Sequence, residues 1–332
     1  MPAAAAVIAK RCSISAACSY TDGMDTGRFE DAGRFKSAAE LPPAPAARRA
    51  RKAAIVRELA ARGHREPLPR WVLEHSKDKA RVAFAAGAAM LALDQIFRSA
   101  PIWFGASRMQ QALAAATAAA KMLRLNADEA SLRDAEHLTR PGDDPGPAGR
   151  VYRLLRGFAG RSLKSAAVML DGIASEIAGA KAAGEVIALL EADLDIARRL
   201  SWPNVILLHL PVIFDPMLRQ GGEARRPRAD ESEWPGLRDA VLARAAIGMH
   251  SRAVETERRA ENLAKAAAAL RTRHGENGLA RILGDESVAP WRMLGENGLG
   301  SDRAARRFCE TLHAMGALRL LTLRPSFRLY GL

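Results

Sequence analysis

Apolar residues recur at helical spacing through most of this chain, and the first run that alternates like a β-strand begins only at Leu318. Before that point Ala and Leu dominate: 48% of the residues are hydrophobic and only 5% are aromatic. Ala and Leu are strong helix formers, whereas strands are enriched in β-branched and aromatic residues. We therefore expect a mostly α fold, with strands confined to the C-terminal end.

The length of 332 residues exceeds the usual size of one compact core, so more than one folded part is expected. Residues 1–69 begin with Ala, Ser, Gly and scattered charges and continue into an arginine-rich stretch, which predicts a disordered, basic extension. Residues 70–273 carry long helical patterns and predict a multi-helix body. Residues 274–332 then form a separate small domain.

The small C-terminal domain combines three helical patterns with two strand-like runs. Its clearest helix starts at Ser301, a good N-cap, and ends before Gly316, which suits a left-handed C′ position. Shorter helices are predicted over residues 279–283 and 288–296. Residues 318–322 and 327–331 alternate like strands around a break at Pro325. Three helices followed by a short β-hairpin outline a winged helix-turn-helix.

Six arginines of this domain are candidate DNA contacts. Three lie opposite the apolar stripe of the predicted third helix and three lie on the hairpin: Arg303, Arg306 and Arg307, then Arg319, Arg324 and Arg328. A recognition helix needs such a division, because its apolar face packs on the domain while guanidinium groups reach phosphates and base edges. The structural alternative is an ordinary polar helix face, with hairpin arginines that keep a sheet edge soluble.

The most distinctive segment of the body is GDDPGPAGR, from Gly142 to Arg150. As a structural loop it ends one helix at Gly142 and starts the next, with Asp143 or Asp144 as a cap and Pro147 in the first turn. The functional alternative uses these aspartates and Asp134 for a metal or for proton transfer, with Arg150 as an anion clamp. We favour the structural loop, because no histidine or further acid accompanies the aspartates at ligand spacing.

Three stretches together resemble a known family. They are Leu132–Ala135 (LRDA), the Gly142–Arg150 loop and the terminal Phe327–Leu332 (FRLYGL). In this combination the chain resembles, over roughly residues 75–332, the bacterial family catalogued as domain of unknown function 1403. The resemblance implies no activity, cofactor or site residue. The basic N-terminal extension lies outside the region that resembles the family.

Several classes of function lack the residues they need. No zinc spacing, phosphate-binding loop or serine elbow is present, so we expect no enzyme, cofactor or metal. The three cysteines suggest no disulfide framework, and the first residues do not form a signal peptide. The longest apolar run, Val82 to Leu93, is too short to span a bilayer. A cytoplasmic protein without a membrane partner is therefore expected.

The formal net charge of +13 favours a phosphate-rich partner. Our leading hypothesis is a DNA-binding transcriptional or plasmid-maintenance regulator, in which the body serves for dimerisation or effector sensing. DNA is then the expected partner, and a homodimer is left open. The alternative is a non-enzymatic helical protein-interaction scaffold, in which the winged domain packs on the body. A weaker third hypothesis is a hydrolase or nuclease that uses Asp134, Asp143 and Asp144.

Overall fold

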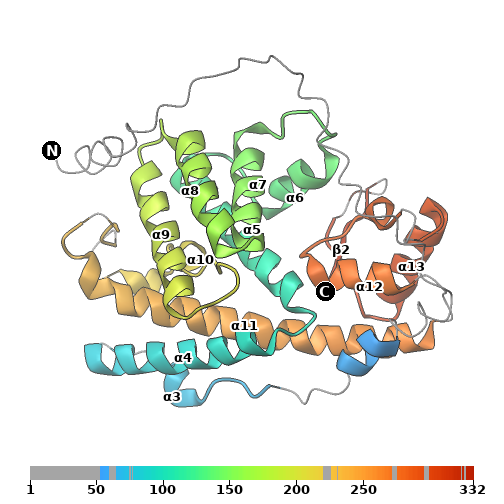
Figure 1. The fold of residues 1–332 in the computed structure, drawn as a ribbon, viewed down its shortest axis with the longest axis horizontal. Coiled ribbons are helices and arrows are strands. Elements are labelled where there is room, and N and C mark those ends of the chain that lie inside the picture. The colour runs from blue at the N-terminus through green and yellow to red at the C-terminus, as the bar shows by residue number, and fades with distance from the viewer. Residues whose placement is uncertain are drawn as a thin grey trace, which may run out of the picture. The chain divides into compact units, whose positions relative to one another are not determined.

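The fold is that of a computed structural model (Figure 1), whose described residues belong to one compact unit, Pro42–Leu332. The described residues are 53–59, 65–74, 76, 78–219, 226–229, 231–270, 275–294, 299–322, 324 and 327–332. This unit contains both the predicted body and the predicted C-terminal domain.

Helices make up most of the described chain, as predicted. They are α3 (Arg70–Leu73), α4 (Lys79–Ser99), α5 (Phe104–Met122), α6 (Glu129–Leu138), α7 (Gly146–Gly160), α8 (Leu163–Ile177), α9 (Ala183–Arg199), α10 (His209–Val212), α11 (Trp234–Ala269), α12 (Gly275–Gly284) and α13 (Asp302–Ala314), with 3-10 turns η1 (Pro216–Leu218) and η2 (Pro290–Met293). The named strands of the described residues are β1 (Arg319–Leu320) and β2 (Tyr330–Gly331). They pair antiparallel, with Arg319 opposite Gly331.

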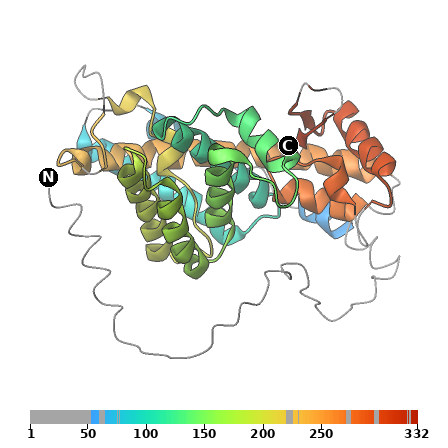
Figure 2. The ribbon, with the colours of Figure 1, turned by 90° about the horizontal axis from the view of Figure 1, so that it is seen from above.

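The longest helix, α11, runs along α4, as Figure 1 and Figure 2 show in two orientations. Alanines on both helices are buried at this contact, among them Ala89 and Ala246, each 0% exposed. Small side chains allow two helix backbones to approach closely, which explains why an Ala-rich chain can bury a core with few aromatic rings. Asp78 caps α4 by accepting a hydrogen bond from Ala80 N at 2.9 Å.

Helix α5 lies in the centre of the body and contacts α7, α10, α11 and α12. Its middle turns are almost entirely alanine, and Ala112, Ala115 and Ala119 are fully buried. At Gly105 a Cβ atom would lie 2.8 Å from the Cα of Gly284, so α5 and α12 meet through glycine. This contact joins the C-terminal segment directly to the centre of the body.

The C-terminal segment agrees with the sequence at its third helix and differs at its second. Ser301 caps α13 by accepting from Ala304 N at 3.2 Å, and Gly316 has φ of 71°, as predicted. In place of a helix over 288–296, the structure has only η2, and residues 295–298 lie outside the described part. Val288 forms an antiparallel bridge with Tyr330, whose two hydrogen bonds of 2.7 and 3.0 Å keep Val288 extended.

Part of the predicted N-terminal extension packs against the body. Residues 53–59 are helical, and Leu59 is buried in the main hydrophobic core. Arg65 forms an ion pair with Glu257 of α11, and its guanidinium lies 5.3 Å from the centre of the Trp103 ring. The rest of that prediction falls on residues 1–52 and 60–64, outside the described residues.

Candidate functional site

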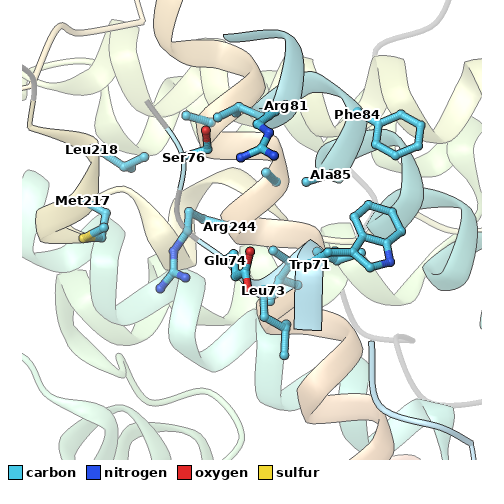
Figure 3. Close-up of a pocket in the computed structure, with 15 residues that line it drawn as sticks. Trp71, Leu73, Glu74, Ser76, Arg81, Phe84, Ala85, Met217, Leu218 and Arg244 are labelled. Carbon is cyan, nitrogen blue, oxygen red and sulfur yellow. The ribbon is translucent and has the colours of Figure 1, made fainter. Parts of the chain in front are cut away.

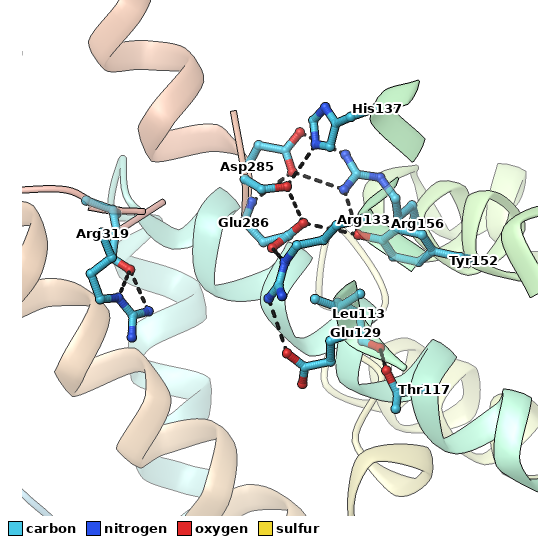
Figure 4. Close-up of polar contacts among 12 residues, drawn as sticks. Leu113, Thr117, Glu129, Arg133, His137, Tyr152, Arg156, Asp285, Glu286 and Arg319 are labelled. Atoms are coloured by element: carbon cyan, nitrogen blue, oxygen red, sulfur yellow. Dashed lines mark hydrogen bonds and ion pairs between the residues drawn. The ribbon is translucent and has the colours of Figure 1, made fainter. Parts of the chain in front are cut away.

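A cluster of charged and polar side chains lies where the body meets the C-terminal segment (Figure 4). We call it the polar joint and define it as Arg133 and His137 of α6, Tyr152 and Arg156 of α7, and Asp285, Glu286 and Ser287 of the turn after α12. Its members come from three places in the chain, and its ion pairs and hydrogen bonds run from α6 and α7 to the turn.

Local sequence places the body half of the polar joint. Helix α6 is fixed at its start by a capping box, in which Asp128 Oδ1 accepts from Ser131 N at 2.8 Å and Ser131 Oγ accepts from Asp128 N at 2.9 Å. From that start, Arg133 and His137 are four residues apart and share one face. Tyr152 and Arg156 have the same spacing on α7, so both pairs point toward the turn.

Glu286 is the most buried acid of the polar joint, with 2% exposure. Arg133 Nε donates to its Oε2 at 2.9 Å, Tyr152 Oη donates to Oε1 at 3.4 Å, and the Ser287 hydroxyl also donates to Oε1. Burial raises the pKa of Glu286, because a charged carboxylate is poorly stabilised away from water. Arg133 acts in the opposite direction by stabilising the charged form.

The neighbouring Asp285 pairs with Arg156 through two parallel hydrogen bonds. Arg156 Nη1 lies 3.0 Å from Asp285 Oδ1, and Nη2 lies 2.8 Å from Oδ2. Arg156 also donates to Tyr152 Oη at 3.1 Å. Such two-pronged contacts fix geometry as well as adding attraction, so they hold the turn in one position on α7.

His137 is 6% exposed, and burial lowers its pKa to about 4, with Arg292 adding to the effect. Its Nε2 lies 2.9 Å from Ser287 Oγ. A serine beside a histidine is the arrangement of a nucleophile and its base. Here the Ser287 hydroxyl hydrogen is used on Glu286, so the shared proton belongs to His137 Nε2. Ser287 is also 1% exposed, and this contact is therefore structural.

The GDDPGPAGR loop lies beside the polar joint, and the structure does not gather its acids into one site. Gly142 has φ of 93°, Asp144 Oδ1 accepts from Gly146 N at 2.9 Å, and Arg150 pairs with Asp144 at 2.7 Å. The Asp143 side chain is exposed. Asp134 instead pairs with Arg324 at 2.8 Å. Within the described residues, no three His, Cys, Asp or Glu side chains could hold a metal ion.

Four of the six candidate DNA-contacting arginines interact with groups of this chain. Arg306 pairs with Asp302 at 2.7 Å, and Arg328 pairs with Glu310 at 2.9 Å. Arg324 holds Asp134 of α6, and Arg319 donates to the Leu332 carbonyl oxygen at 2.8 and 3.1 Å. The other two, Arg303 and Arg307, are exposed one turn apart on α13, without an ion pair among the described residues.

A second buried polar pair lies inside the body, away from the polar joint. His209 Nδ1 is 2.6 Å from Asp193 Oδ1, and the backbone N–H groups of Leu208 and His209 donate to the same carboxylate. Both side chains are almost fully buried, at 2% and 0% exposure. This pair fixes the chain before α10, and it leaves His209 buried and hydrogen-bonded.

Sequence analysis missed most of the polar joint, namely His137, Tyr152, Arg156 and the acidic turn. The available signal was Asp285-Glu286 directly after an apolar helix, together with Arg133 and His137 at i and i+4 spacing. Neither of these two patterns predicts which residue it contacts, because Arg133 and Glu286 are 153 residues apart in the sequence. The LRDA stretch was recognised as distinctive, and the structure shows that it supplies Arg133 to this cluster.

These features define a class: an all-α chain whose C-terminal segment is fastened to a helical body by buried ion pairs. The profile described as "Protein of unknown function (DUF1403)" matches residues 57–178 and 159–332. The chain therefore belongs to the DUF1403 family, as the LRDA, GDDPGPAGR and FRLYGL stretches predicted. No curated protein and no solved structure matches it.

One described helix, α4, is long and apolar enough to cross a membrane when only length and composition are considered. The apolar run from Val82 to Leu93, expected to be too short to span a bilayer, is only part of this helix, which runs from Lys79 to Ser99 and has 21 residues. Only a third of its most apolar window is buried. The exposed part of α4 is therefore a surface that needs a physical explanation.

Proposed function

We propose that this protein is a non-enzymatic, helical protein-interaction scaffold in which the C-terminal segment is a fixed part of the body. The observation that carries the proposal is the polar joint, in which Arg133 and Arg156 of the body hold the acids of the turn. A DNA-binding protein needs its cationic side chains to be available to the phosphates of the DNA backbone. Four of the six candidate arginines are instead engaged by groups of this chain.

The exposed face of α4 supports an interaction role. Phe84 is 69% exposed, Leu91 is 60% exposed, and Gly87 lies between them on the same helix face with open space beside it. Contiguous exposed apolar surface of this kind marks sites of protein association. A partner helix could approach closely at Gly87, and a second copy of this chain is one partner to test.

We expect Leu91→Glu to reduce recovery of the partner at least tenfold when the tagged protein is purified from its source cells, because a buried charge opposes apolar association. Val168→Glu is the matched control, since Val168 is 73% exposed on α8, away from α4. Quantitative mass spectrometry measures co-purifying proteins, and light scattering measures self-association. The proposal is contradicted if Leu91→Glu and Val168→Glu recover the same co-purifying proteins in the same amounts.

DNA binding is the second candidate, and the exposed Arg303 and Arg307 favour it. They lie four residues apart on α13, and the order α12, η2, α13, β1 and β2 is compatible with a winged helix-turn-helix. The bridge between Val288 and Tyr330 supports the same arrangement. In this proposal α13 enters the major groove, and the arginines bound within the chain contribute little to affinity.

If DNA is the partner, Arg307→Ala should weaken binding by about 1–3 kcal/mol on a cognate site. Arg199→Ala removes another exposed cation, on α9, and should leave the affinity unchanged. Fluorescence anisotropy on genomic fragments across a salt series measures both. Undetectable binding at low salt by the folded wild-type protein would exclude this candidate and leave the scaffold.

A further inference from the structure

A groove with a volume of about 330 Å³ opens between α3, α4, α11 and η1 (Figure 3). Val72 and Leu218 are nearly fully buried in it, at 2% and 1% exposure. Trp71 and Phe84 stack with their ring centres 5.3 Å apart at its edge. This volume falls within the range of small-molecule sites, which are lined mainly by apolar and aromatic side chains.

The polar residues of the groove are Glu74, Ser76, Arg81 and Arg244. Arg244 is held by Asp215 of the η1 turn at 2.8 Å, and Glu74 lies 3.8 Å from Arg70. Arg81 has no ion pair within the described residues. In Figure 3 the two arginines lie toward one side of the groove, and Trp71 and Phe84 lie toward the other. The groove therefore offers an apolar surface with one uncompensated positive charge.

We propose that this groove binds a free amphipathic organic anion, with its carboxylate at Arg81 and its apolar part against the exposed apolar side chains of the lining, among them Leu73 and Met217. The charge decides the class of ligand. An apolar cation would meet the guanidinium groups of Arg81 and Arg244, whereas the acid of the groove, Glu74, already faces Arg70 at 3.8 Å. A neutral hydrocarbon would gain no attraction from the charge of Arg81.

Binding of the anion does not require the proposed scaffold function, although the groove and the partner surface share Phe84. The groove lies at the N-terminal end of α4, where Phe84 forms its edge, whereas the partner surface continues along α4 to Leu91. A ligand in the groove would contact Phe84 and so lie beside that partner surface. The anion is therefore in a position to act as an effector of the interaction.

The test uses calorimetric titration of the full-length protein with decanoate, 1-decanol and decyltrimethylammonium, all below their aggregation concentrations. We expect one decanoate per chain, bound about tenfold more tightly than the cation, because only the carboxylate pairs with Arg81. Dodecanoate should bind about tenfold more tightly than decanoate, because it buries two more methylene groups.

Arg81→Gln should weaken decanoate binding about tenfold. Arg199→Gln, which removes an exposed charge elsewhere, should leave it unchanged. Ala243→Phe fills the groove and should abolish binding, with its melting temperature recorded to show that it folds. Arg81 is exposed, so its variant keeps the test decisive even if Ala243→Phe does not fold.

Other results would overturn the proposal. Equal affinity for decanoate and the cation, several weak sites per chain, or no effect of Arg81→Gln would indicate adventitious binding of a surfactant. If the full-length chain binds none of these compounds, the proposal is wrong, and a protein segment becomes the alternative occupant of the groove. Association only with phosphatidylglycerol vesicles, abolished by Leu91→Glu but not by Arg81→Gln, would show that the exposed face of α4 meets a membrane.

Discussion

Replacing Arg133 with methionine is expected to lower the free energy of unfolding at pH 7 by about 3–5 kcal/mol. Methionine roughly preserves the aliphatic part of the arginine side chain, but it lacks the charge that pairs with Glu286 at 2.9 Å. Glu286 is 2% exposed, so its carboxylate then lacks both water and its main cation. Urea unfolding followed by circular dichroism measures the change. The effect should become smaller as the pH falls, because the raised pKa of Glu286 favours uptake of a proton by its carboxylate.

Arg133→Met combined with Glu286→Gln should recover part of the lost stability, because the double variant no longer buries an unpaired carboxylate. Arg140→Met is the matched control. Its side chain is exposed near the end of α6 without an ion pair among the described residues, so it should change stability by at most about 0.5 kcal/mol. Equal effects of Arg133→Met and Arg140→Met would contradict a stabilising role for the polar joint.

The sequence was sufficient where structure depends on neighbours along the chain. Ala/Leu periodicity predicted the helices, and Ser301 and Gly316 marked the ends of α13 because caps act within one turn. The helix expected over 288–296 was not found in the described residues. Val288 pairs with Tyr330 there, and this contact between distant residues determines the backbone at that point. Local propensity could not predict it.

The candidate sites divide in the same way. Asp144 and Arg150 are six residues apart, and the sequence placed both in one structural loop. The ion pairs Arg133–Glu286 and Asp134–Arg324 join residues that are far apart in the chain, so α6 could not be recognised as their common element. Arginines of the hairpin can also be paired with acids that are distant in the sequence, as Arg324 is with Asp134. For this reason charge pattern alone overstated the number of free cations in the C-terminal segment.

The protein should lose stability as the pH falls below about 6.5, and His137 should account for about 3 kcal/mol of this loss by pH 4. Burial lowers the pKa of His137 to about 4 in the folded state, against the ordinary 6.5. Between these values the unfolded chain binds a proton that the folded chain excludes, so protonation favours unfolding. Its stabilising contribution is therefore fully present above pH 6.5.

Comparison with His137→Gln isolates this contribution, since glutamine can still hydrogen-bond Ser287. The other charged groups near His137 are Arg292, Arg156, Asp285 and Glu136. These groups remain in both proteins, as does Glu286, whose raised pKa acts in the opposite direction. The stability advantage of the wild type over His137→Gln should therefore fall between pH 7 and pH 4.

His313→Gln, which removes an exposed histidine of α13, should retain the pH dependence of the wild-type stability. Parallel curves for wild type and His137→Gln would show that the folded and unfolded chains bind a proton at His137 equally, which would contradict the lowered pKa of His137.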